Sequence, residues 1–182
     1  MSTIATERAQ IPEIREYAEG DARDVGILIA ETYGNVNLAA VSSGEAASML
    51  GPFAFARSPA PVHQAAIAEA ILAPSVWVAD LCGEIVGVLR GGRTDHRGRT
   101  VLSSLFVARS HHRQGIGRAL VERFEREYAA RGVHVFKTAA TEYAVPFYLS
   151  LGYKKSTGAR AMSSFGQSGL RYQPMRKVLD LS

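Results

Sequence analysis

Residues 101–132, VLSSLFVARSHHRQGIGRALVERFEREYAARG, decide the fold of this chain. The first seven, from Val101 to Val107, are largely apolar, which is typical of a strand buried on both faces. From Ile116 onwards apolar residues recur every four positions, as on one face of a helix, and Gly132 follows as a stop signal. A basic turn with two glycines joins these segments. The stretch therefore predicts a strand, a tight turn and a helix in direct succession.

The turn between this strand and this helix is suited to bind an anion. The first amides of a helix have no acceptor within the helix, and the helix dipole adds positive potential there. Gly115 and Gly117 lack the β-carbons that would hold a phosphate away from the backbone, and Arg113 and Arg118 are close in sequence. The turn has neither the Gly-x-x-x-x-Gly-Lys-Ser/Thr pattern nor the third glycine of a dinucleotide fingerprint. We expect a pyrophosphate on its backbone amides.

Further elements are expected on both sides of this stretch, from periodicity and turn residues. Before it we expect a strand over 14–17, a helix over 21–34, one or two helices joined by irregular chain within 35–74, a hairpin of strands 76–79 and 84–89, and a turn over 91–99. After it we expect a strand over 133–136, a short helix over 142–151, a loop over 156–169, and strands near 152–154 and 175–179. This order predicts an α/β fold with a mixed sheet.

Length and composition indicate one globular domain over residues 1–182, with 47% hydrophobic and 21% charged residues. No apolar run approaches the roughly 20 residues that span a bilayer, so no membrane partner is expected. The polar N-terminal residues do not resemble a secretion signal. Cys82 is the only cysteine, so no intrachain disulfide can form, and a cytoplasmic location is expected.

Charge is unevenly distributed along the chain. Residues 1–88 hold 4 basic and 11 acidic residues, whereas residues 89–182 hold 17 basic and 6 acidic ones. The basic half favours an anionic ligand. Nucleic acid is one such ligand, but no nucleic-acid-binding motif is present, so none is expected as a partner. A phosphorylated cofactor needs the same charge over a smaller area.

Two motifs resemble those of the GNAT superfamily of acyl-CoA-dependent N-acetyltransferases. The family signature is Arg or Gln, two variable residues, Gly, any residue, then Gly or Ala. Residues 112–117, HRQGIG, carry it with His112 at the Arg/Gln position. Residues 144–153, AVPFYLSLGY, are similar to the family's Ala-x-x-Phe-Tyr-x-x-x-Gly-Phe/Tyr segment, with Thr141 where Asn is common.

The resemblance implies a mostly antiparallel sheet of about six to seven strands, flanked by helices and splayed at the strand from Val101 to Val107. Acetyl-CoA would lie in the gap as co-substrate, and an amine would attack its thioester directly. A backbone amide would polarise the thioester carbonyl, and Tyr148 would be the general acid. Because the amine attacks directly, Cys82 is not expected to act as a nucleophile. The implied cofactor-binding residues are Leu105, Phe106, Val107, His112, Arg113, Gln114, Gly115, Ile116, Gly117, Arg118 and Thr141.

The acceptor site and the general base are less defined. Ser103 and Ser104 stand where many relatives carry a carboxylate, so a chain of waters would have to remove the amine proton. Glu31, Tyr33 and Ser104 are candidates to line the acceptor pocket. No metal is expected, because the histidines lack ligand spacing.

Several functions stay open at this stage. An enzyme that acetylates the primary amine of a small molecule leads, and the acidic first half favours a cationic amine. The alternatives are a protein N-terminal or lysine acetyltransferase and a noncatalytic acyl-CoA-binding sensor. A homodimer is also left open.

Overall fold

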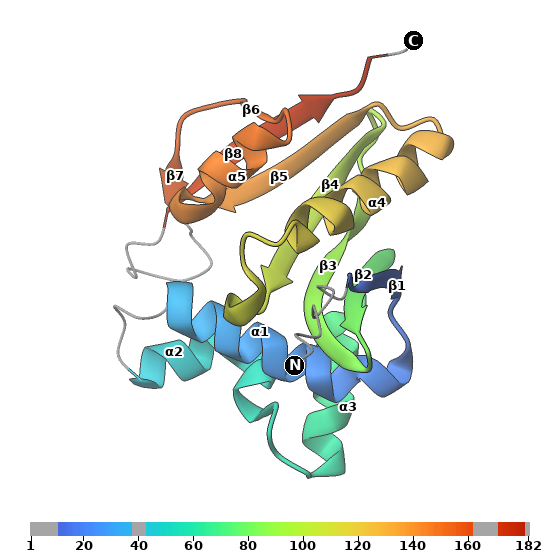
Figure 1. Ribbon diagram of the computed structural model, residues 1–182. Coiled ribbons are helices and arrows are strands. Elements are labelled where there is room, and N and C mark those ends of the chain that lie inside the picture. Colours follow the sequence, from blue (N-terminus) through green and yellow to red (C-terminus); the bar gives the residue numbers. More distant parts are fainter. Residues whose placement is uncertain (1–10, 38–42, 162–170, 181–182) are drawn as a thin grey trace, which may run out of the picture.

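A single mixed sheet organises the computed structural model, which describes residues 11–37, 43–161 and 171–180 (Figure 1). Its strands are β1 (Glu13–Glu16), β2 (Ser75–Leu81), β3 (Glu84–Thr94), β4 (Arg99–Val107), β5 (Val135–Thr141), β6 (Lys154–Lys155), β7 (Arg160–Ala161) and β8 (Arg171–Val178). They lie in the order β1-β2-β3-β4-β5-β8-β6, and β7 also pairs with β8. Every described pairing is antiparallel except that of β4 with β5. The predicted fold class is confirmed.

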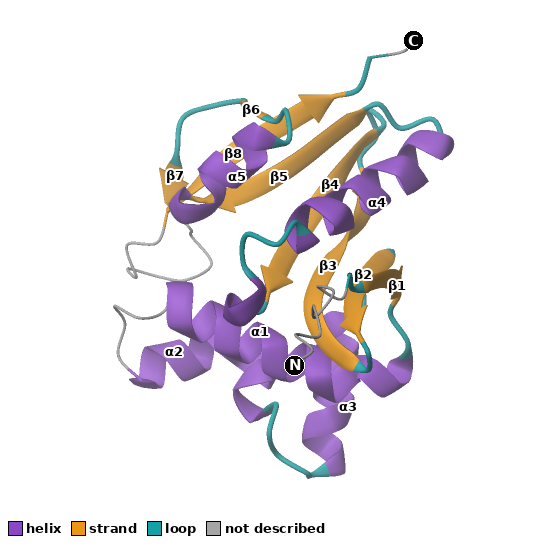
Figure 2. Cartoon of the chain, in the orientation of Figure 1, coloured by secondary structure: helices purple, strands orange, loops and turns teal. Residues whose placement is uncertain are grey.

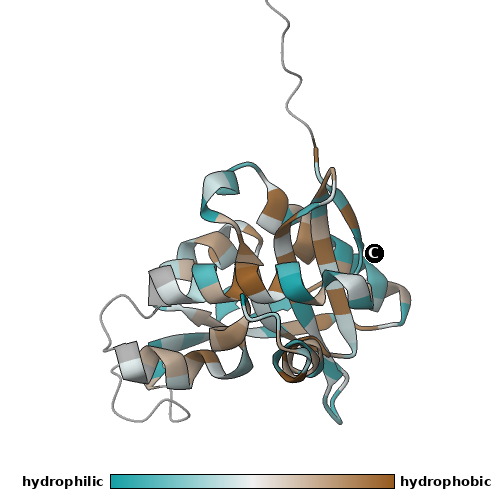
Figure 3. Cartoon of the chain, turned by 90° about the horizontal axis from the view of Figure 1, so that it is seen from below, coloured by the Kyte–Doolittle hydropathy of each residue, from teal (hydrophilic) through white to brown (hydrophobic). Residues whose placement is uncertain are grey.

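Helices cover both faces of the sheet (Figure 2). One face carries α1 (Ala22–Asn37) and α3 (Pro61–Ile71), with α2 (Ser43–Leu50) beside them; the other carries α4 (Ile116–Ala130) and α5 (Val145–Ser150). Short 3-10 turns connect them: η1 (Glu19–Asp21), η2 (Gly51–Phe55), η3 (Arg109–His111) and η4 (Glu142–Ala144). In Figure 3 the helices carry both hydrophobic and hydrophilic residues, as expected for helices with one buried face.

The α4 helix has the periodicity that the sequence predicts. Ile116, Leu120, Phe124 and Tyr128 are all buried against the sheet. Full burial of a side chain such as Phe124 contributes roughly 1.5–3 kcal/mol. The helix ends before Gly132, whose φ of 82° turns the chain so that the Val133 amide donates to the Tyr128 carbonyl (3.0 Å).

The sheet opens between β4 and β5. The two strands pair only from Arg99–Val135 to Leu102–Thr138. Beyond that point β4 continues along β3 as far as Val107, while β5 continues along β8 as far as Thr141. The gap, visible in Figure 1 between the ends of β4 and β5, confirms the splay at the strand from Val101 to Val107.

The turn predicted over residues 91–99 is shorter in the structure, where it spans residues 95–98, because β3 continues through Gly91 and Gly92 to Thr94. A β-carbon on Gly91 would lie 2.6 Å from the Val101 carbonyl oxygen, and one on Gly92 would lie 1.9 Å from the Tyr128 hydroxyl. These glycines permit close packing within the sheet and against α4. The sheet also has one strand more than the upper end of the predicted range, because the two-residue β7 pairs with β8 inside the predicted loop.

The actual turn between β3 and β4 is organised by Asp95. Its carboxylate accepts hydrogen bonds from the amides of Arg97 (2.9 Å) and Arg99 (3.1 Å) and from the Arg99 Nε (2.8 Å). Burial alone would raise the pKa of Asp95, but these donors lower it to about 2. The turn therefore depends on an ionised carboxylate.

Candidate active site

The backbone between β4 and α4 forms a concave array of amides. Arg113 has a φ of 63° and Gly115 a φ of 84°, whereas the intervening Gln114 has no positive φ. Left-handed residues in such a turn can direct neighbouring N–H groups towards one side, as in the anion-binding concavities called nests, and residues 113–117 are called the nest below. Gly115 is the N-cap of α4, no side chain caps the helix, and the first helical bond runs from the Ala119 amide to the Gly115 carbonyl (2.9 Å). The amides of the first turn are thus available to a ligand.

The two signature glycines serve different purposes. A β-carbon on Gly115 would meet nothing within 4 Å, so its left-handed φ explains why glycine suits this position. A β-carbon on Gly117 would lie 3.2 Å from the Phe147 ring and 3.7 Å from a Leu105 methyl group. Gly117 therefore lets α4 approach α5, and a larger side chain there would disturb the protein before it reached a phosphate.

The basic side chains near the nest are not equivalent. Arg118 is 3.6 Å from the Glu122 carboxylate and donates to the Ser150 carbonyl (3.4 Å). In the described part of the chain the exposed Arg113 side chain has no hydrogen bond or ion pair. Gln114 donates to the Ser110 carbonyl (3.2 Å). Arg113 is therefore an exposed cation next to the nest whose side chain could contact a phosphate.

His112 connects the turn to the end of β4 through a side-chain hydrogen bond. Its Nε2 lies 2.9 Å from the Val107 carbonyl oxygen. Because a carbonyl can only accept, Nε2 carries the proton and donates. The residue at the Arg/Gln position of the signature thus holds the strand end in place.

Backbone groups at alternate residues of β4 point towards the gap, and among them the Val107 carbonyl accepts the hydrogen bond from His112. The Ala108 amide donates to the Val86 carbonyl (2.8 Å), so these opposed residues form a hydrogen-bonded pair. Alternation then directs the N–H and C=O of Phe106 towards β3 and those of Leu105 and Val107 towards the gap. Two of the three predicted backbone positions therefore face the place where a pantetheine chain would lie.

Tyr148 lies near the point where β4 and β5 separate. It is buried on α5, with its ring packed edge-on against Phe147 (5.1 Å) and Tyr153 (5.3 Å). Burial raises the pKa of Tyr148 to about 12, and a hydrogen bond with the Thr138 hydroxyl acts in the opposite direction. Thr138 is the last β5 residue that pairs with β4. The Tyr148 hydroxyl is therefore close to the mouth of the gap and protonated at neutral pH.

The predicted acceptor residues separate into two groups. Tyr33 packs edge-on against Phe106 (6.1 Å), and the Ser104 Oγ is buried two residues further back on β4 with no hydrogen-bond partner in the described chain. Glu31 is exposed and paired with Arg57. Thr141, which was predicted to contact the cofactor, lies at the end of β5, and its side chain does not cap the following η4.

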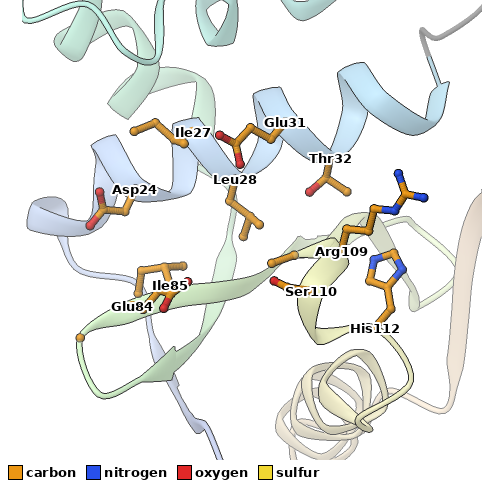
Figure 4. Close-up of a pocket in the computed structure, with 12 residues that line it drawn as sticks. Asp24, Ile27, Leu28, Glu31, Thr32, Glu84, Ile85, Arg109, Ser110 and His112 are labelled. Atoms are coloured by element: carbon orange, nitrogen blue, oxygen red, sulfur yellow. The ribbon is translucent and has the colours of Figure 1, made fainter.

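Glu31 lines a separate groove of about 480 Å³. The groove lies between α1 on one side and the β2–β3 turn and η3 on the other (Figure 4). His112 also lines it, so the groove borders the outer side of the signature turn.

Arg90, a half-buried residue of β3, is not among the site residues predicted from the sequence. A charged residue at the end of the apolar run EIVGVLR was the available signal.

The gap-facing edge of β4, the nest at the start of α4 and the buried tyrosine form the arrangement expected of a transferase that uses a CoA thioester. The acetyltransferase (GNAT) domain family model matches residues 45–179, and the chain belongs to this family. It is an acetyl-CoA-dependent N-acetyltransferase. No curated protein matches by sequence.

Solved structures share the fold. A GCN5-related N-acetyltransferase from Rhodopseudomonas palustris has a TM-score of 0.69 at 21% identity, over 93% of this chain and 96% of that one. The PaiA N-acetyltransferase from Thermoplasma acidophilum, solved with coenzyme A, has a TM-score of 0.68 at 14% identity, over 91% and 98%. A ribosomal-protein-alanine N-acetyltransferase from Brucella melitensis has a TM-score of 0.61 at 23% identity, over 92% and 99%.

Two further observations concern the described residues alone. Nowhere among them do three His, Cys, Asp or Glu side chains gather as a metal ion would require. None of their helices has the length and apolar character needed to span a bilayer.

Proposed function

We propose that this enzyme transfers the acetyl group of acetyl-CoA to the primary amine of a small molecule, by direct attack on the thioester. The observation that carries this proposal is the gap between β4 and β5, which has the nest and Tyr148 on its α4/α5 side. A cofactor held there leaves the α1 side of the gap for the amine.

The backbone of β4 would stabilise the reaction. The amides of Leu105 and Val107 point into the gap, and either can donate to the thioester carbonyl oxygen as negative charge develops on it. As the new C–N bond forms and the C–S bond breaks, one amine proton must leave. The Ser104 hydroxyl is too weak a base to keep it at neutral pH, so we assign this proton to water.

Tyr148 would stabilise the departing thiolate. Its pKa of about 12 lies roughly 3.5 units above that of a free thiol, about 8.5. Full proton transfer from Tyr148 to sulfur is therefore unfavourable, whereas a hydrogen bond from its hydroxyl is available over the whole physiological pH range. We expect Tyr148 to act mainly as this hydrogen-bond donor.

The arrangement of α1 supports a small acceptor. Tyr33 at the end of this helix packs against Phe106 of β4, so the helix approaches the edge of the gap on the acceptor side. Tyr33 is half-buried, so an acceptor that enters beside it would be partly enclosed by protein. We also propose a cytoplasmic location, on the sequence grounds given above.

A screen of primary amines tests this function. Purified enzyme is mixed with acetyl-CoA and each amine, including peptides with free N-termini and with lysine, and release of free thiol is followed. Turnover with at least one small amine, exceeding that with every peptide, is the expected result. Faster turnover of peptides would indicate that the acceptor is a protein. Binding of CoA without turnover of any amine would indicate a noncatalytic sensor.

A further inference from the structure

Arg90 is a half-buried cation that has no counter-charge among the described residues. Its Nε is fully buried and lacks a hydrogen-bond partner, and in the described ranges its side chain has no hydrogen bond or ion pair at all. Burial lowers its pKa, with no neighbouring carboxylate to raise it. A desolvated charge of this kind destabilises a protein unless something else compensates it.

Ser104 lies directly opposite Arg90. The two residues face each other across β3 and β4, and the Ser104 Oγ is also buried and unpartnered in the described structure. Buried polar groups of native proteins nearly always have partners, so two unsatisfied ones on adjacent strands need a common explanation. A shared ligand that accepts hydrogen bonds would satisfy both.

These two residues are on the sheet face that carries α1 and α3, Ser104 on the strand that borders the gap and Arg90 on the next strand. On β3, Arg90 is on the same face as Val88, and on β4, Ser104 is on the same face as Phe106; Val88 and Phe106 both belong to the core under α1 and α3. The nest and Tyr148 belong to the opposite face, which carries α4 and α5. Ser104 is two residues beyond Leu102, where β4 leaves β5.

We propose that Arg90 and Ser104 bind a carboxylate on the acceptor, so that the substrate is an amino acid or a related amine that carries a carboxylate near its amino group. The inference rests on the proposed function and specifies its substrate class. The guanidinium donates two hydrogen bonds to a carboxylate in a matching plane, and the hydroxyl donates a third. One cation opposite one hydroxyl suits a singly charged group better than a phosphate, which carries more charge.

The substrate test compares amines that differ only in this group. The twenty common L-amino acids, β-alanine and γ-aminobutyrate are each assayed against the corresponding carboxamide, with kcat/KM corrected for the fraction of neutral amine. We expect the best carboxylate acceptor to exceed its carboxamide by at least about tenfold, as expected for one charge-assisted contact. Equal values for every pair would overturn the inference while leaving the proposed function standing.

The Arg90→Met variant removes the charge and keeps much of the side-chain volume. We expect KM for the best carboxylate acceptor to rise about 10- to 100-fold with a smaller change in kcat, and KM for its carboxamide to stay within twofold. Arg93→Met is the matched control, because Arg93 is an exposed arginine on the same strand, and it should leave both values unchanged. Preservation of the carboxylate preference in Arg90→Met would refute the inference.

Thermal unfolding gives an independent readout that requires no turnover. Without ligand, Arg90→Met should have a Tm equal to that of the wild type or about 2–4 °C higher, because an uncompensated charge has been removed. Preferred amino acids should raise the Tm of the wild type and of Arg93→Met but not that of Arg90→Met. A lower Tm for Arg90→Met, with no carboxylate-dependent shift in the wild type, would show that Arg90 is a structural residue.

Discussion

Replacement of Gly115 by alanine tests the nest with the smallest change available. At a φ of 84° an alanine costs roughly 1–2 kcal/mol of backbone strain. Gly132 is a matched control at the other end of α4: its φ is 82°, and a β-carbon at either position would meet nothing within 4 Å. Gly115→Ala and Gly132→Ala should therefore lose similar amounts of unfolding free energy.

Only the first substitution should affect the cofactor. A shift of the Gly115 backbone away from its left-handed conformation would misdirect one amide of the nest, and a hydrogen bond to a charged group contributes about 1.5–3 kcal/mol. Since about 1.4 kcal/mol corresponds to a factor of ten, the Kd for CoA should rise roughly 10- to 100-fold.

Calorimetric titration of CoA into the wild type and both variants measures this difference, with equilibrium unfolding as the check on stability. Gly132→Ala should bind CoA within twofold of the wild type. If folded Gly115→Ala binds CoA as tightly as Gly132→Ala does, the nest is not the pyrophosphate site. Gly117 is unsuitable for this test, since a side chain there would press on Phe147.

Three further changes test other parts of the structure. Tyr148→Phe keeps the buried ring and should lower kcat by roughly 10²-fold with the Kd for CoA nearly unchanged; because the pKa of Tyr148 is about 12, the wild-type to variant kcat ratio should stay constant from about pH 6 to 10, and a ratio near one would make Tyr148 a packing residue. Asp95 has a pKa lowered to about 2, since its amide and guanidinium donors outweigh the effect of burial, so its stabilisation is complete above about pH 4 and is lost as pH falls through 2. Acid unfolding of Asp95→Asn should consequently show a weaker pH dependence between these values, and an unchanged dependence would contradict the role of the ionised carboxylate. Gly92→Ala would place a β-carbon against the Tyr128 hydroxyl and should cost about 1–3 kcal/mol more than Gly83→Ala, which has a similar φ of 94° and open space, as urea unfolding would show; equal losses would refute the packing argument.

Most elements were predictable because their signals are local. The apolar residues of α4 recur with the helical period, and the strand from Val101 to Val107 is apolar enough to be recognised by itself. The region of residues 35–74 was harder, since helix formers and breakers alternate there. The structure starts α3 at Pro61, because proline disrupts the interior of a helix but is well tolerated in its first turn.

The local sequence did not predict that Gly91 and Gly92 belong to a strand. A glycine pair is the same signal whether the chain turns or another part of the protein approaches closely. Here Tyr128, 36 residues further along the chain, approaches Gly92, and only the packing of α4 on the sheet reveals it.

The sequence by itself was sufficient to predict the proposed cofactor-binding half of the site. The nest needs only consecutive residues, since its amides belong to one strand, turn and helix, and Tyr148 lies within a second continuous motif. Backbone groups that are adjacent in sequence are adjacent in space, so short motifs could indicate them.

The acceptor half was decided by the tertiary structure. Summed along the chain, the acidic first half favours a cationic amine, yet several of its carboxylates are already paired: Asp21 and Asp80 with Arg15, and Glu31 with Arg57. Arg90, on β3, is half-buried and has no partner among the described residues. Electrostatic interaction depends on distance and burial, and both are set by how β3, β4 and α1 pack rather than by the order of residues.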